Sequence, residues 1–196
     1  MNLETSATSQ PKPERSVGSR TFTRRVLYRL RQFWLSLSGK PGAAQMERAQ
    51  AALSAQEFAL FRRLQPGEQV HSLQILFELE QHGQIHPSLL AAALLHDAGK
   101  IRYPLQPWER ALIVLAAAVF PQQAHAWGEN NGEPPGWRKP FVVARQHAAW
   151  GAELAAQAGS PALTVALIRR HQEANPAGER EEDHLLAWLQ AFDDES

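Results

Sequence analysis

The sequence predicts an all-α protein of about six to eight helices. Beyond residue 43, apolar residues recur every three or four positions, and proline or glycine stands where one such stretch gives way to the next. Runs of β-branched residues between turn residues, which would predict strands, are missing, and no segment repeats at a fixed period. The chain has 196 residues, of which 44% are hydrophobic, so it is long enough for one domain and a tail but short for two domains.

The N-terminal part differs in composition from the rest. Residues 1–19 are rich in Ser, Thr, Pro and charge with little to bury, which predicts a disordered tail. Residues 20–40 contain a predicted basic amphipathic helix over 20–37, with five arginines among apolar residues at helical spacing. Such a helix suits an anionic membrane surface or a partner protein, or it packs on the protein's own core. The apolar residues are Phe22, Val26, Leu27, Leu30, Phe33, Trp34 and Leu37.

Residues 43–196 form the predicted helical domain. Proline stands at the expected first position of three helices, and glycine follows the expected end of three. Ser54 and Glu57 form a predicted capping box inside a longer helical stretch. The expected helices span about residues 45–64, 66–81, 87–98, 107–120, 141–158, 161–172 and 180–192.

Residues 122–140 are predicted to form a long loop, because Gly, Pro and Asn are frequent there. Long loops in small domains often cover a functional site, and this loop contains His125. The alternative is a surface loop without a functional role. Trp127 and Trp137 also lie in this segment, outside the expected helices, where they are placed to stack on a base.

The composition excludes several classes of function. The chain has no cysteine, which excludes disulfides, thiolate nucleophiles, zinc fingers and iron–sulfur clusters. Its formal net charge is zero, and it contains no glycine-rich phosphate loop, serine nucleophile elbow or stripe of basic and aromatic residues, so we expect no nucleic-acid partner. The N-terminus lacks a secretory apolar region and the longest apolar run, 111–120, has ten residues. A bilayer span needs about 20, so we expect a cytoplasmic protein.

The segment "LLHDAGK" at 94–100 ends an apolar helix-like run in a histidine and an aspartate. Each polar residue of this kind alone is most often a half-buried or solvated side chain. Buried together in a small helical core, they would cost several kcal/mol per unpaired charge, and a divalent cation compensates for all of them. Nitrogen and carboxylate ligands without thiolate suit divalent ions such as Mn, Fe, Co, Ni, Zn or Mg. The candidate residues are His71, His96, Asp97, His147, His171 and the terminal pair Asp193 and Asp194.

The order of these residues resembles the H…HD…D signature of the HD-domain metal-dependent phosphohydrolase superfamily, which has an all-α fold. The resemblance covers residues 65–195, and "HAAWGAEL" at 147–154 and "HQE" at 171–173 are similar to strings of its HD-GYP branch. It implies an HD-domain-like helical bundle with up to two metal ions. One ion would be held by His71, His96, Asp97 and Asp193, with Asp97 bridging to a second ion held by His147 and His171. Asp193 is preferred to Asp194 because the first Asp of "AFDD" aligns with the family's aspartate.

Two departures from the HD-GYP pattern matter. No Gly-Tyr-Pro follows Glu173, so hydrolysis of cyclic di-GMP is not implied. Gln172 stands where that branch has a second histidine, which weakens a second or third metal position. The number of ions, their identity and the oligomeric state stay open.

The expected function follows from these residues. A pair of metal ions generates hydroxide near neutral pH and clamps both oxygens of a phosphoester displacement. Asp97 and Lys100 are the expected catalytic residues, and Lys100, Arg145 and Arg170 are expected to bind the substrate phosphate. We therefore expect a phosphohydrolase acting on a small phosphorylated molecule, with a nucleotide phosphoester as the favoured class. The alternative is a regulatory module that binds a nucleotide or a metal without turnover.

Overall fold

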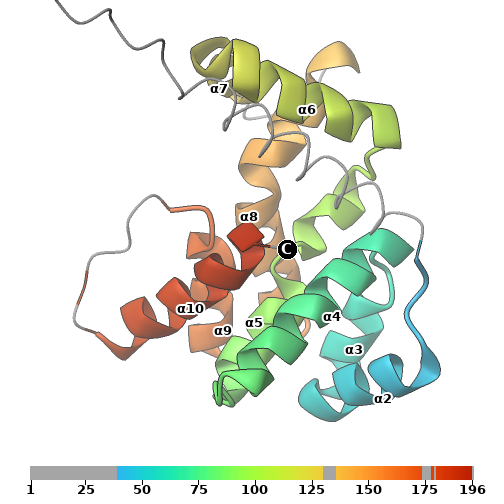
Figure 1. Ribbon diagram of the computed structural model, residues 1–196, viewed down its shortest axis with the longest axis vertical. Helices are drawn as coiled ribbons and strands as arrows, with labels where there is room; N and C mark the ends of the chain where they lie inside the picture. The colour runs from blue at the N-terminus through green and yellow to red at the C-terminus, as the bar shows by residue number, and fades with distance from the viewer. Residues whose placement is uncertain (1–38, 130–135, 174–177, 179, 196) are drawn as a thin grey trace, which may run out of the picture.

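The structure, a computed structural model, describes residues 39–129, 136–173, 178 and 180–195. The predicted tail and the predicted basic helix of residues 20–37 lie outside the described residues. The described part contains nine α-helices, two 3₁₀-helices and no strand, which confirms the all-α prediction (Figure 1). The elements are α2 (Ala43–Ala52), α3 (Ala55–Phe61), α4 (Pro66–Gln81), α5 (Pro87–Leu95), η1 (Ala98–Arg102), α6 (Pro107–Val119), α7 (Pro121–Gly128), η2 (Gly136–Arg138), α8 (Lys139–Gln157), α9 (Ala162–Arg170) and α10 (Glu181–Glu195).

One predicted helix is two helices in the structure. The stretch expected at 45–64 divides at Ser54, which begins α3 through the predicted capping box. The Ser54 backbone N–H donates to Glu57 Oε2 at 2.9 Å, and the Ser54 hydroxyl accepts from the Glu57 N–H at 3.3 Å. These bonds satisfy backbone donors that a continuous helix would have used otherwise, so the chain turns between α2 and α3.

The prediction of a loop over 122–140 is wrong for all its described residues except Glu129, since residues 122–128 lie in α7, 136–138 in η2 and 139–140 in α8. Residues Pro121–Gly128 form α7, with Pro121 at its first turn, where a missing N–H costs nothing. Trp127 packs edge-on against Phe141 and Trp137, with ring centroids 5.0 and 5.4 Å away. The expectation that both tryptophans lie outside helices therefore fails, because Trp127 lies in α7 and packs on the start of α8, and Trp137 lies in η2.

Helix α5 is the centre of the fold. Every residue from Ser88 to Leu95 is buried, and the helix is apolar around its whole circumference, as expected of a helix with neighbours on all sides. It contacts α2, α3, α4, α9 and α10. In Figure 1 these helices surround it in the lower part of the molecule, while α6 and α7 lie together at the top.

The end of α5 is pressed against α8 through a glycine. A Cβ built on Gly99 of η1 would lie 2.0 Å from the His147 carbonyl oxygen and 2.7 Å from the Gly151 amide nitrogen. Both are backbone atoms, so only glycine permits this approach. The contact brings the last residues of α5 alongside the middle of α8.

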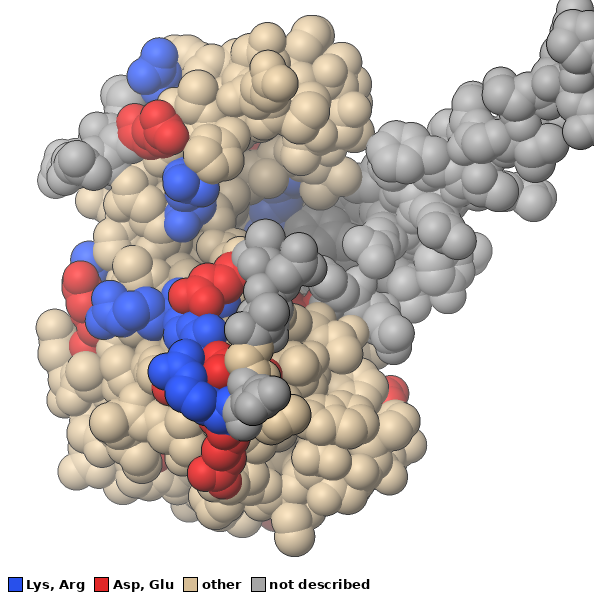
Figure 2. Space-filling model, turned by 90° about the vertical axis from the view of Figure 1, so that its left-hand side faces the viewer, with Lys and Arg blue, Asp and Glu red and all other residues tan. Residues whose placement is uncertain are grey.

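The surface is unevenly charged. On the face shown in Figure 2, acidic and basic side chains gather across the lower body, whereas the upper part of the molecule is mostly uncharged, with a hollow beneath it. Among the described helices, none is long and apolar enough to cross a membrane.

Candidate metal centre

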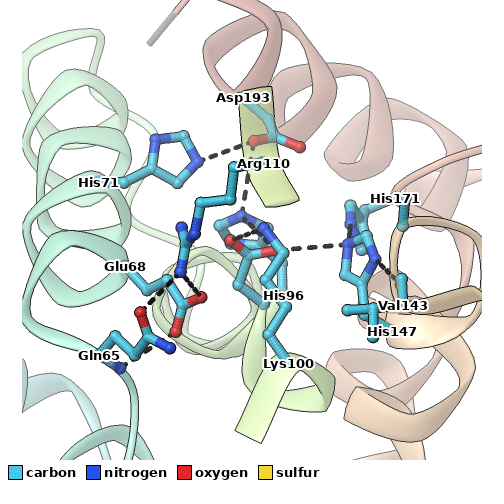
Figure 3. Close-up of polar contacts among 12 residues, drawn as sticks. Gln65, Glu68, His71, His96, Lys100, Arg110, Val143, His147, His171 and Asp193 are labelled. Carbon is cyan, nitrogen blue, oxygen red and sulfur yellow. Dashed lines mark hydrogen bonds and ion pairs between the residues drawn. The ribbon is translucent and has the colours of Figure 1, made fainter. Parts of the chain in front are cut away.

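Six of the residues singled out in the sequence meet at one place, although they come from five helices (Figure 3). In two groups of three, the ligand atoms all lie within 4.8 Å of one another. The first group is His71 of α4, His96 at the end of α5 and Asp193 of α10; the second is Asp97, His147 of α8 and His171 at the end of α9.

The first group is built around one carboxylate oxygen. Asp193 Oδ1 lies 3.0 Å from His71 Nε2 and 3.5 Å from His96 Nε2. His96 is 1% exposed, whereas His71 and Asp193 are only partly buried. The group therefore joins the buried end of α5 to the last turn of α10.

The second group is built around Asp97, which is 3% exposed. Asp97 Oδ1 lies 3.3 Å from His147 Nε2 and 3.7 Å from His96 Nε2. His171 Nε2 lies 3.3 Å from His147 Nε2. Because Asp97 Oδ1 faces histidines of both groups, it occupies the position that a bridging carboxylate needs.

Three of the imidazoles are oriented by their own helices. The Nδ1 atoms of His96, His147 and His171 each bond a backbone carbonyl three or four residues earlier. A carbonyl oxygen only accepts, so each Nδ1 carries the proton and the Nε2 of the neutral ring keeps its lone pair. This outer contact is typical of metal-binding histidines. The acceptors are the carbonyls of Ala93 at 2.9 Å, Val143 at 2.9 Å and Ile168 at 2.7 Å.

The donor set fits a divalent cation. His147 and His171 direct their Nε2 atoms at each other, and His147 Nε2 also faces Asp97 Oδ1, an arrangement that a shared cation stabilises. The buried His96 Nε2 makes no hydrogen bond within the described part of the chain. A divalent cation coordinated by these nitrogens and by the carboxylates would satisfy every one of these atoms.

The pKa values of the ligands also favour a bound cation. Burial lowers the pKa of His96, but the charges of Asp97 and Asp193 raise it to about 9. Burial raises the pKa of Asp97, but Lys100 and His96 hold it well below 3.8. His171 behaves differently, because burial and the charges of two neighbouring histidines lower its pKa to about 3. Burial raises the pKa of the partly buried Asp193, but the charge of His96 and the bond from His71 hold it well below its ordinary value. Both carboxylates therefore stay ionised, and a proton on His96 balances part of a charge that a metal ion would balance fully.

Lys100 lies beside the centre. Its Nζ donates to Asp97 Oδ2 at 2.6 Å, on the opposite oxygen from the histidines. Lys100 also lines a cavity of about 180 Å³, together with His147 and Gln172. Lys100, which is predicted to bind the substrate phosphate, thus contacts the centre and lines the adjacent cavity.

The two arginines predicted to bind the substrate are placed differently. Arg145 lines an open groove of about 720 Å³ between α6, α7 and α8, and Arg169 lines it too. Arg170 instead bonds Glu173 at 2.8 Å, Asp183 at 2.9 Å and Glu182, and lines neither hollow. Arg170 therefore links α9 to the start of α10, while Arg145 faces the approach to the centre.

Gln172 stands apart from both groups of ligands. Its Nε2 donates to the Ala144 carbonyl at 3.1 Å, and the residue lines both the cavity and the groove. The amide thus closes the gap between α9 and α8 at the point where the two hollows meet.

Sequence reasoning missed Arg110, which lies next to the centre in Figure 3. The residue is 7% exposed, and its Nη2 donates to Glu68 Oε1 at 2.6 Å and Gln65 Oε1 at 2.9 Å. It lines the same cavity as Lys100. The available signal was a single arginine in the first turn of the helix expected at 107–120, directly before the uncharged run 111–120.

Comparison with known proteins gives one match. The model of the HD-domain family matches residues 69–195, which include all six candidate ligands. No curated protein and no solved structure matches the chain significantly. The helices α2 and α3 precede the matched region and contribute Ala49, Leu60 and Phe61 to the same core.

Proposed function

The chain belongs to the HD-domain family of metal-dependent phosphohydrolases, and from this premise we propose that it hydrolyses a small phosphorylated molecule, with nucleotide phosphoesters as the favoured class. One observation carries the proposal. The Nε2 atoms of three histidines with fixed tautomers are directed at two ionised carboxylates in a buried centre.

The residues divide into two sets of ligands. His71, His96, Asp97 and Asp193 would hold one ion, and Asp97, His147 and His171 a second. Bound metal at such a centre supplies hydroxide near neutral pH and polarises the phosphoester oxygens. Lys100 holds Asp97 Oδ2, which keeps Oδ1 turned toward the histidines, and its ammonium group adds positive charge beside the cavity.

Asp97→Asn tests the proposal, because it removes the charge of the bridging carboxylate and keeps its shape. We expect the bound metal to fall and phosphoesterase turnover to fall more than about 100-fold, since even outer partners of metal ligands cost 10- to 100-fold. The measurements are elemental analysis and turnover on a panel of nucleotide and sugar phosphates.

The matched control for this variant is Asp183→Asn. Asp183 is also a buried aspartate, but it pairs with Arg170 and Arg180 away from the centre. The control should keep its metal and its turnover. Unchanged turnover in a folded Asp97→Asn protein would contradict the proposal.

A regulatory role without turnover is the second candidate, and Gln172 favours it. An amide that bonds the Ala144 carbonyl stands where the HD-GYP branch has a further histidine. Tight nucleotide binding with no product at any metal loading would support this candidate over hydrolysis.

A further inference from the structure

The cavity beside the centre has two cations on its wall. Lys100 comes from η1 and Arg110 from α6, and His147 lines the same cavity of about 180 Å³. Within this lining, no acidic side chain accompanies the two cations. An anion bound there would lie beside the metal ligand His147 and between two positive side chains.

Arg110 holds its position through α4. Its Nη2 bonds Glu68 and Gln65, and Glu68 is itself 3% exposed. A buried ion pair gains little over apolar residues of similar size, so pairing with Glu68 is a weak reason for an arginine at this place. The pair does fix the guanidinium at the cavity wall, which is what planar recognition of a phosphate requires.

The cavity continues into the larger groove. Ile113, Ala144 and Gln172 line both hollows, so the two meet along α6 and α8. The groove of about 720 Å³ lies within the range of small-molecule sites, about 300 to 1,000 Å³. Figure 2 shows a hollow beneath the mostly uncharged upper part of the molecule.

The lining of the groove indicates what it accepts. Its apolar residues include Ala117 of α6, Pro121 and Ala124 of α7 and Phe141 of α8, and its ionisable residues are His125, Arg145, Arg169 and Glu173. Apolar walls with several polar groups suit an aromatic or nucleoside-type group, whose ring packs on the walls and whose polar edge bonds those groups.

We propose that Arg110, with Lys100, binds the phosphate of the substrate, and that the groove between α6–α7 and α8 receives an aromatic or nucleoside-type group attached to it. This inference rests on the proposed function and deepens it by naming the class of substrate. Helix α6 then has two tasks, since it contributes the cation at its start and an apolar wall farther along.

Phosphate affinity tests the role of Arg110. Inorganic phosphate is titrated calorimetrically into the full-length, manganese-loaded protein. Arg110→Gln should bind phosphate about 10- to 100-fold more weakly, the usual effect of losing hydrogen bonds to a charged group. Arg110→Lys keeps the charge without the planar fork and should lose less.

Two further variants separate anion binding from structural pairing. Glu68→Gln breaks the same ion pair but keeps the guanidinium, so phosphate affinity should be kept or should rise. Arg48→Gln breaks a pair with Glu80 that lines neither hollow, and should leave phosphate affinity unchanged. Equal losses in Arg110→Gln and Glu68→Gln, or no loss in Arg110→Gln, would overturn the assignment. If Arg110→Gln does not fold, the comparison of Arg110→Lys with Glu68→Gln decides in the same way.

Phosphonates test the groove, because their carbon–phosphorus bond is not hydrolysed during the titration. Phenylphosphonate should bind about tenfold more tightly than methylphosphonate, since the ring buries apolar surface in the groove. Ala124→Trp fills the groove and should abolish this preference without changing the affinity for inorganic phosphate. Ala126→Trp, on the same helix but outside the lining, should retain it. If the preference for phenylphosphonate is absent, or survives Ala124→Trp, the groove does not receive the attached group.

The outcomes separate this inference from the proposed function. Arg110-dependent phosphate binding without turnover of any phosphoester would keep the inference and reject hydrolysis. Turnover that is lost in Asp97→Asn but is indifferent to Arg110→Gln and Ala124→Trp would keep hydrolysis and reject the inference.

Discussion

At the scale of single residues, Gly99 allows the close approach of Asp97 to His147 within the second group of ligands. The backbone of η1 rests on the backbone of α8 at this position, two residues from Asp97 and directly against His147. The spacing of Asp97 to His147, 3.3 Å between Oδ1 and Nε2, depends on that contact.

Gly99→Ala should therefore separate the second group of ligands. The added Cβ would overlap the His147 carbonyl oxygen, so η1 must shift, at a cost of about 1–3 kcal/mol in unfolding free energy. Urea denaturation and elemental analysis should show lower stability and fewer bound ions. Gly42→Ala is the control, because its Cβ would meet only the Gln45 side chain at 3.7 Å. A Gly99→Ala protein with unchanged metal content would show that the contact does not position Asp97.

Where a motif named the residues, the sequence could predict which of them lie together. The six candidate ligands follow a recognisable order, and the structure brings all six together. The sequence could not predict the partners of Arg110, because Gln65 and Glu68 are more than 40 residues away and only the tertiary fold makes them neighbours. The same applies to Arg170, whose position beside the ligand His171 indicated a role at the centre but whose guanidinium pairs with α10.

At the scale of elements, Glu57 ties the start of α3 to the turn after α8. Its Oε1 accepts a hydrogen bond from the Ser160 hydroxyl at 2.6 Å, while its other oxygen caps α3. Burial raises the pKa of Glu57, but the hydrogen bonds from Ser160 and Ser54 outweigh burial and lower it below its ordinary value of 4.5.

The lowered pKa predicts a pH dependence of stability. Since the unfolded chain binds the proton more readily, ionised Glu57 stabilises the fold above pH 4.5, and this contribution is lost as the pH falls through the lower folded-state pKa. The difference in unfolding free energy between wild type and Glu57→Gln should be largest near neutral pH and shrink in acid. Urea denaturation at several pH values measures it, and a difference that grows below pH 4.5 would contradict the assignment.

Helix boundaries were predictable where proline, glycine or a capping box marks them. Pro66, Pro87 and Pro107 each begin a helix as expected. Helix α7 was missed because its sequence is short and its stabilising contacts are tertiary: Trp127 against Phe141 and Gly128 beneath the Phe141 carbonyl. The eight residues of α7 have a weak helical pattern, and the helix is stabilised by tertiary packing, which local sequence does not predict.

At the scale of the whole molecule, the candidate centre joins five helices that are distant in sequence. His71 and Asp193 are 122 positions apart, and their contact connects α4 to α10. The all-α class and the helix order followed from local patterns, whereas this arrangement depends on the burial of α5 among its neighbours and could be expected only through the family resemblance.

Metal loading should therefore stabilise the entire fold. An ion at 100 times its dissociation constant adds about 2.7 kcal/mol, which for a chain of this size corresponds to about 5–10 °C in melting temperature. Asp193→Asn should lower the shift, because it removes the negative charge of the carboxylate that faces both His71 and His96. Scanning calorimetry with manganese, and with a chelator as the reference, measures both. An equal shift in wild type and Asp193→Asn would exclude this residue as a ligand.

The bonds from three imidazole Nδ1 atoms to carbonyls of their own helices bear on the kinetics of metal uptake. Each ring is aimed by a partner within one helical turn, so its orientation does not depend on the other rings being in place. An arriving ion meets nitrogens that need no reorientation, and little reorganisation energy is spent. Uptake then requires loss of water from the ion and of the proton from His96, but no reorientation of the rings, so ions with fast water exchange should enter sooner than those with slow exchange, whatever their final affinity.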